Sequence, residues 1–104
     1  MTICVCTDFS ETPGARYRSE GNFSGEEFRE SLLVPKFLEA IQAGEKLTIN
    51  LDGGYGYPTS FLEEAFGGLA RAYGAQVVLD TLEFISLDEP ALIHEIEGYI
   101  KAQK

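Results

Sequence analysis

Apolar and polar residues along the chain follow two spacings, one typical of strands and one typical of helices. Residues 46–51 alternate with a period of two, which predicts a strand. The apolar, β-branched segments 3–7 and 82–86 are predicted as two more strands, and the short, half-exposed segment 15–19 as another. Segment 75–81 fits either a strand or a short helical turn.

Three segments have helical spacing. The first follows Ser24, which can cap it together with Glu27, and it is predicted to kink or restart at Pro35. The second runs from about residue 60 to 73, and the third opens at residues 88–90. The order β-β-α-β-α-β-α predicts one α/β domain over residues 1–104, with a mixed sheet of about four strands and helices packed on it.

Length and charge limit the classes of function that the chain can have. A chain of 104 residues supports one core, and 17 Asp and Glu against 8 Lys and Arg disfavour nucleic acid and anionic membranes as partners. No apolar run approaches the roughly 20 residues of a membrane span. The first residues lack the basic flank and long apolar core of a secretory signal, so we expect a soluble, cytoplasmic protein.

The most informative segment is the glycine-rich bend between the strand at 46–51 and the second helix. Loops that leave the carboxyl end of a strand and enter a helix often bind anions, so the bend (Asp52, Gly53, Gly54 and Gly56) is a candidate ligand loop. It has neither a lysine at Walker spacing nor a complete G-x-G-x-x-G. Tyr55 and Tyr57 favour a protein contact surface, or alternatively they fold back on the core.

The second helix carries an ordinary apolar stripe and an opposite face formed by Ser60, Glu64, Gly67, Gly68 and Arg71. Two adjacent glycines inside a helix cost roughly 1 kcal/mol each relative to alanine. Close packing must offset this, against another element of the domain or against a partner. Ser60 fits two compatible roles: a helix cap paired with Glu63, and a phosphorylated hydroxyl at the positive helix end.

Residue types that often carry catalysis or bind metals are sparse. Cys4 and Cys6 share one face of the predicted strand, where a disulfide is poor, and two sulfurs alone make a poor zinc site, so we expect small buried side chains. His94 is expected on a helix surface. No carboxylate pair has glycosidase or metal-ligand spacing. The sequence therefore predicts no enzyme, no metal and no cofactor.

Three motifs together resemble a known family: residues 14–18 (GARYR), 24–28 (SGEEF) and, most specifically, 59–69 (TSFLEEAFGGL). The resemblance is to the bacterial STAS-like domain family of unknown function, and it covers most of the chain. It implies a fold related to the anti-sigma factor antagonists, small α/β domains that bind a histidine-kinase-type (GHKL) ATPase.

The antagonists carry an Asp-Ser-Ser-Gly motif after the third strand, and a serine in it is the phosphoacceptor. The resemblance places Ser60 at that position and Thr59 before it, with Pro58 in place of the aspartate and Phe61 in place of the glycine. The leading hypothesis is a non-enzymatic regulatory interaction domain whose partner docks around Ser60, and the resemblance implies a GHKL-type ATPase or kinase as that partner. The candidate contacts are Tyr55, Tyr57, Thr59, Ser60, Glu64, Gly67, Gly68 and Arg71. The alternative is a nucleotide- or phosphate-sensing domain that uses residues 52–58 and the helix N-terminus.

Overall fold

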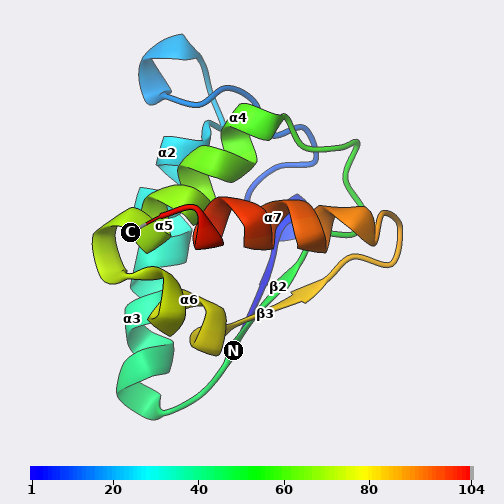
Figure 1. The fold of residues 1–104 in the computed structure, drawn as a ribbon. Helices are drawn as coiled ribbons and strands as arrows, with labels where there is room; N and C mark the ends of the chain where they lie inside the picture. The colour runs from blue at the N-terminus through cyan, green and yellow to red at the C-terminus, as the bar shows by residue number, and fades with distance from the viewer. Residues whose placement is uncertain (104) are drawn as a thin grey trace.

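A computed structural model describes residues 1–103 (Figure 1). Three strands alternate with helical segments, some of which are a single turn of 3₁₀ or π geometry. Along the chain they are β1 (Thr2–Cys4), α1 (Val5–Asp8), η1 (Arg18–Glu20), α2 (Gly25–Phe28), η2 (Arg29–Leu33), α3 (Val34–Ala43), β2 (Leu47–Asn50), α4 (Thr59–Leu62), η3 (Glu63–Gly67), α5 (Gly68–Tyr73), α6 (Ala75–Thr81), β3 (Leu82–Ile85) and α7 (Ala91–Lys101).

The sheet has the strand order β1-β2-β3, and both pairs of strands are parallel. Ile49 at its centre pairs with Ile3 on one side and Phe84 on the other. The prediction of a mixed sheet of about four strands is therefore wrong for residues 1–103, although the α/β class is confirmed. Helical crossovers connect consecutive strands, as parallel pairing requires.

The missing strand is segment 15–19, whose backbone groups are used elsewhere. The carbonyls of Ala15 and Arg16 accept hydrogen bonds from the amides of Gly25 (2.9 Å) and Glu26 (3.0 Å), the first amides of α2. These bonds satisfy donors that a helix start leaves free. The segment thus caps a helix, and it does not enter the sheet.

The first predicted strand is also shorter than its apolar pattern suggested. The chain is extended only as far as Cys4, and Val5–Asp8 forms a helical turn, α1. The Asp8 carboxylate accepts a hydrogen bond from the Cys4 amide at 2.8 Å, which stabilises this turn. Cys6 therefore lies in a helical turn, and the prediction that both cysteines share a strand is wrong.

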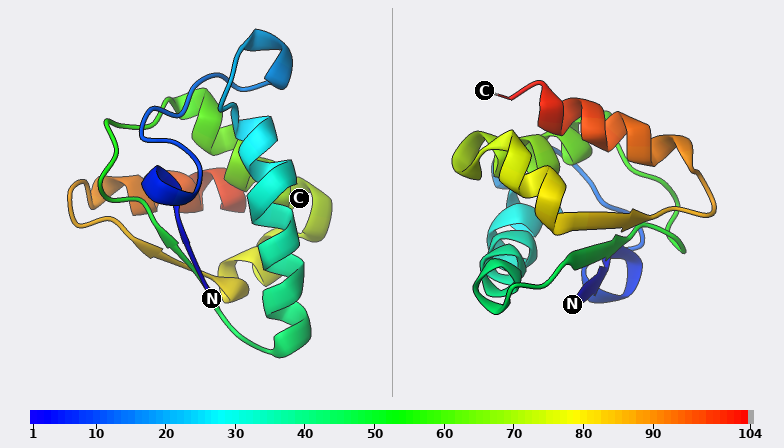
Figure 2. Two further views of the ribbon diagram at one scale, coloured as in Figure 1. Left: turned by 180° about the vertical axis from the view of Figure 1, so that it is seen from behind. Right: turned by 60° about the horizontal axis from the view of Figure 1, so that its bottom comes forward.

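Helices cover one face of the sheet. The side chains of Ile3, Leu47, Ile49 and Leu82 on that face are buried, whereas Thr2, Glu83 and Ile85 on the other face are exposed. In the view from behind, α7 lies on the far side of the strands, and α1, which follows β1, lies on the near side (Figure 2). Parallel sheets are usually covered on both faces, so an open face is uncommon.

Aromatic rings fill much of the core between the helices. Phe28 in α2 packs against Phe61 in α4 and Phe66 in η3, with ring centroids 5.6 and 6.0 Å apart. Phe66 in turn meets Phe84 of β3 edge-on at 5.5 Å. This row of rings joins the two central helices, which begin with α2 and α4, to β3 of the sheet.

The remaining helix predictions hold with local changes. Residues 25–43 are helical, but a π turn, η2, precedes Pro35, so the expected interruption is present. Residues 59–73 are helical with a second π turn, η3. Segment 75–81, which fitted either a strand or a helical turn, is a helix, α6. Among residues 1–103, none of the helices has the length and apolar character that crossing a bilayer demands.

Candidate binding site at the carboxyl end of the sheet

The segment from Leu51 to Pro58 forms the bend that joins β2 to α4. Gly53 (φ 93°) and Gly56 (φ 119°) adopt left-handed conformations that residues with a Cβ avoid. Tyr57 closes the bend, because its hydroxyl donates a hydrogen bond to the Leu51 carbonyl at 2.8 Å. Burial raises the pKa of Tyr57 well above its ordinary value. Tyr57 therefore folds back on the domain, whereas Tyr55 is 82% exposed.

The bend is tied to the loop that follows β3. The Asp88 amide donates to the Asp52 carboxylate at 2.9 Å, and the Gly53 amide donates to the Asp88 carboxylate at 3.2 Å. The two aspartates thus hold the two loops together through a reciprocal pair of bonds. An amide that an anion would need at this bend is already bound to a carboxylate.

A hollow of about 260 Å³ lies between these two loops. Leu51, Tyr55 and Tyr57 line it from the β2 side, and Ser86, Asp88 and Glu89 line it from the β3 side. A second hollow of about 350 Å³ lies on the other side of the tyrosines, against Thr12 and Pro13. Tyr55, Gly56 and Tyr57 line both hollows, so this end of the sheet is grooved, partly apolar and acidic.

The start of the second helix differs from its prediction. Pro58 occupies the N-cap position, and no side chain caps this end of the helix, so the predicted Ser60–Glu63 capping pair is wrong. Thr59 is exposed and Ser60 is half-buried. Glu63 does not reach back to Ser60, because arginines hold its carboxylate further along the helix.

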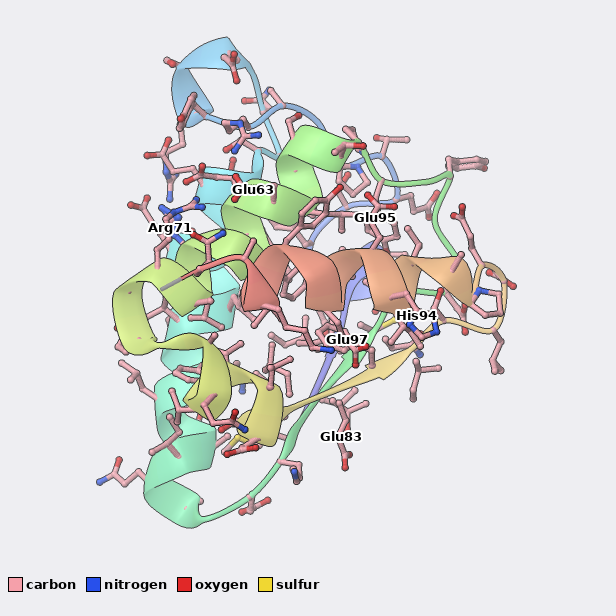
Figure 3. The ribbon with its side chains drawn as sticks, viewed as in Figure 1. Glu63, Arg71, Glu83, His94, Glu95 and Glu97 are labelled. Atoms are coloured by element: carbon pink, nitrogen blue, oxygen red, sulfur yellow. The ribbon has the colours of Figure 1, made fainter. Side chains whose placement is uncertain are left out.

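Those arginines belong to an ion cluster that we call the arginine–glutamate cluster: Arg16, Arg29, Arg71, Glu63 and Glu64. Glu64 is buried, with 9% of its side chain exposed, and it lies 2.9 Å from Arg29 and 3.5 Å from Arg16. Glu63 pairs with Arg71 at 2.5 Å (Figure 3), and it also pairs with Arg16. Arg71 first and Arg16 next lower the pKa of Glu63. The cluster joins the N-terminal segment, η2 and the second helix.

The glycine pair of this helix lies under the same side chains. A Cβ at Gly68 would lie 2.7 Å from Nη1 of Arg29, and one at Gly67 would lie 2.7 Å from Oε2 of Glu63. Both glycines are buried, as is Glu64. Of the two alternatives, packing within the domain is therefore the one observed. Glu64, Gly67 and Gly68 are covered within the domain, and that they contact a partner stays a prediction.

The sequence did not single out the loop residues Leu87, Asp88 and Glu89 as part of a site, although Asp88 and Glu89 line the hollow opposite the bend. Leu87 is 83% exposed. A usable signal was present: these residues follow the predicted strand 82–86, and the carboxyl ends of parallel strands share one edge of a sheet. Because a mixed sheet was expected, the loops after these two strands were not predicted to lie at the same edge.

Other candidate groups are placed as follows. His94 lies on the surface of α7 with 91% of its side chain exposed, as predicted, and Glu97 is its neighbour (Figure 3). Within residues 1–103, no group of three or more His, Cys, Asp or Glu side chains is arranged to hold a metal ion. Cys4 and Cys6 are half-buried free thiols, so the expectation of small buried side chains is wrong.

Comparison with known proteins gives one match. The family model described as STAS-like domain of unknown function (DUF4325) matches residues 24–92, from the cap of α2 to the first turn of α7. The matched region includes both central helices, β2, β3 and the bend. No curated protein and no solved structure matches the chain.

Proposed function

The chain belongs to the family of STAS-like domains of unknown function, and we propose that it is a non-catalytic regulatory domain that docks a protein partner at the carboxyl end of its sheet. One observation carries this proposal. Tyr55 and Leu87 are 82% and 83% exposed, and the next most exposed large apolar side chain among the described residues is Tyr17 at 46%. Both lie on loops that flank the same hollow.

The composition of this surface favours a protein over a small anion. Aromatic side chains beside a groove are enriched in protein interfaces, where a polar rim surrounds an apolar centre. Asp52, Asp88 and Glu89 give the rim a negative charge, and the chain as a whole has a net charge of −9. This supports a partner with a basic contact surface.

The partner class follows from the family resemblance. The related anti-sigma factor antagonists bind a GHKL-type ATPase, so an ATPase or kinase of that class is our proposed partner. The docking surface we propose keeps Tyr55, Tyr57 and Thr59 from the sequence-based hypothesis and adds Leu87 and Asp88. It moves the contact away from Gly67 and Gly68, which the arginine–glutamate cluster covers.

Phosphorylation near the start of α4 remains a prediction. An added phosphate would lie close to the bend, and arginines balance the charge of Glu63 and Glu64, which would otherwise oppose it. Intact-mass analysis of protein from its native host, with Thr59→Ala and Ser60→Ala variants for assignment, tests this. A consistently unmodified mass would contradict it.

Nucleotide or phosphate sensing is the alternative function from the sequence. The amide of Gly53 is bound to the Asp88 carboxylate, and acidic side chains surround the bend, which disfavours a phosphate there. Thermal-shift measurements with ATP, GTP and inorganic phosphate distinguish the two functions. We expect no shift, and a saturable one would favour the alternative.

Docking is tested by affinity capture with matched variants. We expect a protein from the host lysate to be retained by the wild type and lost by the Tyr55→Ala/Leu87→Ser double variant. Ile41→Ser serves as control, because Ile41 is 43% exposed in α3, away from the hollow. A protein retained equally by all three would contradict docking at this end of the sheet. A GHKL-type ATPase among the lost proteins would support the partner class.

A further inference from the structure

The sulfur atoms of Cys4 and Cys6 lie 3.8 Å apart, in contact with each other. They meet because the chain changes from extended to helical geometry after Cys4 (φ −102°, ψ 106°), the N-cap residue of α1. In a fully extended strand, residues two apart are separated by about 7 Å, the upper limit for a disulfide. The turn at Val5 shortens this separation and brings the thiols together.

Both thiols are half-buried, so small reagents can reach them. The two differ in reactivity. Hydrogen bonding by Thr7 lowers the pKa of the Cys4 thiol, whereas burial raises the pKa of the Cys6 thiol. Because a thiolate is the attacking species, Cys4 is the expected nucleophile and Cys6 the resolving thiol.

The Cys6 sulfur supports the bend of the candidate docking surface. A Cβ at Gly53 would lie 2.9 Å from the Cys6 Sγ, so the α-carbon of Gly53 packs directly over this sulfur. The same N-terminal segment holds the bend a second time, since the Glu11 carbonyl accepts a hydrogen bond from the Tyr55 amide at 2.9 Å. A movement of Cys6 is therefore transmitted to the bend.

We propose that Cys4 and Cys6 form a redox-active dithiol that a low-molecular-weight disulfide oxidises to an intrachain disulfide, and that this oxidation displaces the bend at Gly53. A disulfide bond is about 2.05 Å long, so the sulfurs must approach each other by more than 1 Å. Because the Cys6 Sγ lies against Gly53, a shift of this sulfur changes the contact that supports the bend. The site is a modification site whose reagent class is a small disulfide such as oxidised glutathione.

The chemistry balances in two exchange steps. The Cys4 thiolate attacks one sulfur of the small disulfide, which breaks the S–S bond, forms a mixed disulfide on Cys4 and releases one thiol. Cys6 gives its proton to solvent and attacks the Cys4 sulfur, which forms the Cys4–Cys6 bond and releases the second thiol. The two protein thiols lose two electrons and two protons in total, and the small disulfide gains them.

The test uses the whole chain and needs no partner. After incubation with oxidised glutathione, we expect wild type to lose both alkylatable thiols and the mass of two hydrogens. Cys6→Ser should instead keep one glutathione on Cys4, because no resolving thiol is left. Cys4→Ser should react with glutathione several-fold more slowly than Cys6→Ser. Wild type that keeps its thiols, or that carries two stable glutathione adducts, would overturn the proposal.

The coupling to the bend has a separate readout. In two-dimensional amide NMR, oxidation should shift the Gly53 and Gly54 signals, while signals from the C-terminal half of α7 stay in place. The Cys4→Ser/Cys6→Ser double variant is the control, and its spectrum should not respond to oxidised glutathione. A disulfide that forms without moving the Gly53 signal would overturn the coupling. Any effect of the disulfide on docking rests on the proposed function, whereas these measurements need no partner. The redox proposal and the proposed function can therefore fail independently.

Discussion

Gly25, in the first turn of α2, lies directly against the backbone carbonyl of Phe61 in α4. A Cβ built on Gly25 would come within 2.6 Å of that carbonyl oxygen and within 3.0 Å of the Cβ of Glu64. The two central helices therefore cross at a point where only hydrogen fits. This crossing sets the position of α4, and with it the end of the bend.

Replacing Gly25 with alanine should be strongly destabilising. The atom in the way belongs to the main chain of a neighbouring helix, so neither partner can rotate aside and the helices must separate. We expect the free energy of unfolding to fall by about 2–3 kcal/mol, as for overpacked cores. Urea unfolding followed by circular dichroism measures this.

Gly98 in α7 provides the matched control. A Cβ there would meet nothing within 4 Å, and the residue lies on the exposed side of the helix. Gly98→Ala should therefore raise the free energy of unfolding by about 0.5–1 kcal/mol, because alanine is the better helix former. Equal effects of the two substitutions would contradict the close crossing at Gly25.

The buried carboxylate of Glu64 should be the most sensitive member of the arginine–glutamate cluster. Glu64→Gln keeps the volume but leaves Arg29 and Arg16 facing a neutral amide. Removing one partner of a largely buried ion pair costs about 2–4 kcal/mol, since the remaining charge is poorly solvated. Chemical unfolding of the variant and of wild type at neutral pH tests this.

Glu30→Gln is the corresponding surface change. Glu30 pairs with Arg18 at 3.0 Å, but about half of each side chain is exposed. Exposed pairs contribute little, so we expect a change below about 0.5 kcal/mol. If both variants lost the same stability, the special position of Glu64 would be refuted.

Glu63 should make stability depend on pH in the acid range. Its pKa is lowered in the folded state, chiefly by Arg71 and then by Arg16. A carboxyl with a lowered folded pKa contributes stability above its unfolded pKa of about 4.3, and the contribution is lost as the pH falls through the folded pKa. Wild type should lose this contribution on acidification, and Glu63→Gln should show a shallower loss. The test is to measure the melting temperatures of wild type and Glu63→Gln across the acid range. Curves that diverge as described would support the prediction, and parallel curves would contradict it.

Local patterns predicted most of the helices and the strands β2 and β3. Ser24 accepts a hydrogen bond from the Glu27 amide at 3.0 Å, as its position before the apolar pattern indicated. The error over segment 15–19 arises because its backbone groups bond to residues well beyond the segment. Segment 15–19 looks like a strand, yet its carbonyls serve α2, and no local pattern records such a bond.

At the candidate site, the sequence predicted the glycine-rich bend but not all of the side chains that surround it. The bend was predicted from its glycines, and Tyr55 is exposed as a contact residue must be. Gly67 and Gly68 suggested a close approach, and that approach is real, but Arg29 and Glu63 make it. Glycine spacing indicates that something packs closely, and it does not say what. Only the register of β2 and β3 brings Leu87 and Asp88 to the bend.

The hydrogen bond of the Tyr57 hydroxyl should stabilise the conformation of the bend. Tyr57→Phe keeps the ring but removes the hydroxyl that donates to the Leu51 carbonyl at 2.8 Å. We expect a loss of about 0.5–1.5 kcal/mol in stability and faster amide hydrogen exchange at Gly53 and Gly54, because an unpaired carbonyl and a freer loop result. Tyr55→Phe is the control, since no hydrogen bond of the Tyr55 hydroxyl is present among the described residues and the ring is 82% exposed. Unchanged exchange in Tyr57→Phe would mean that the reciprocal bonds of Asp52 and Asp88 hold the bend by themselves.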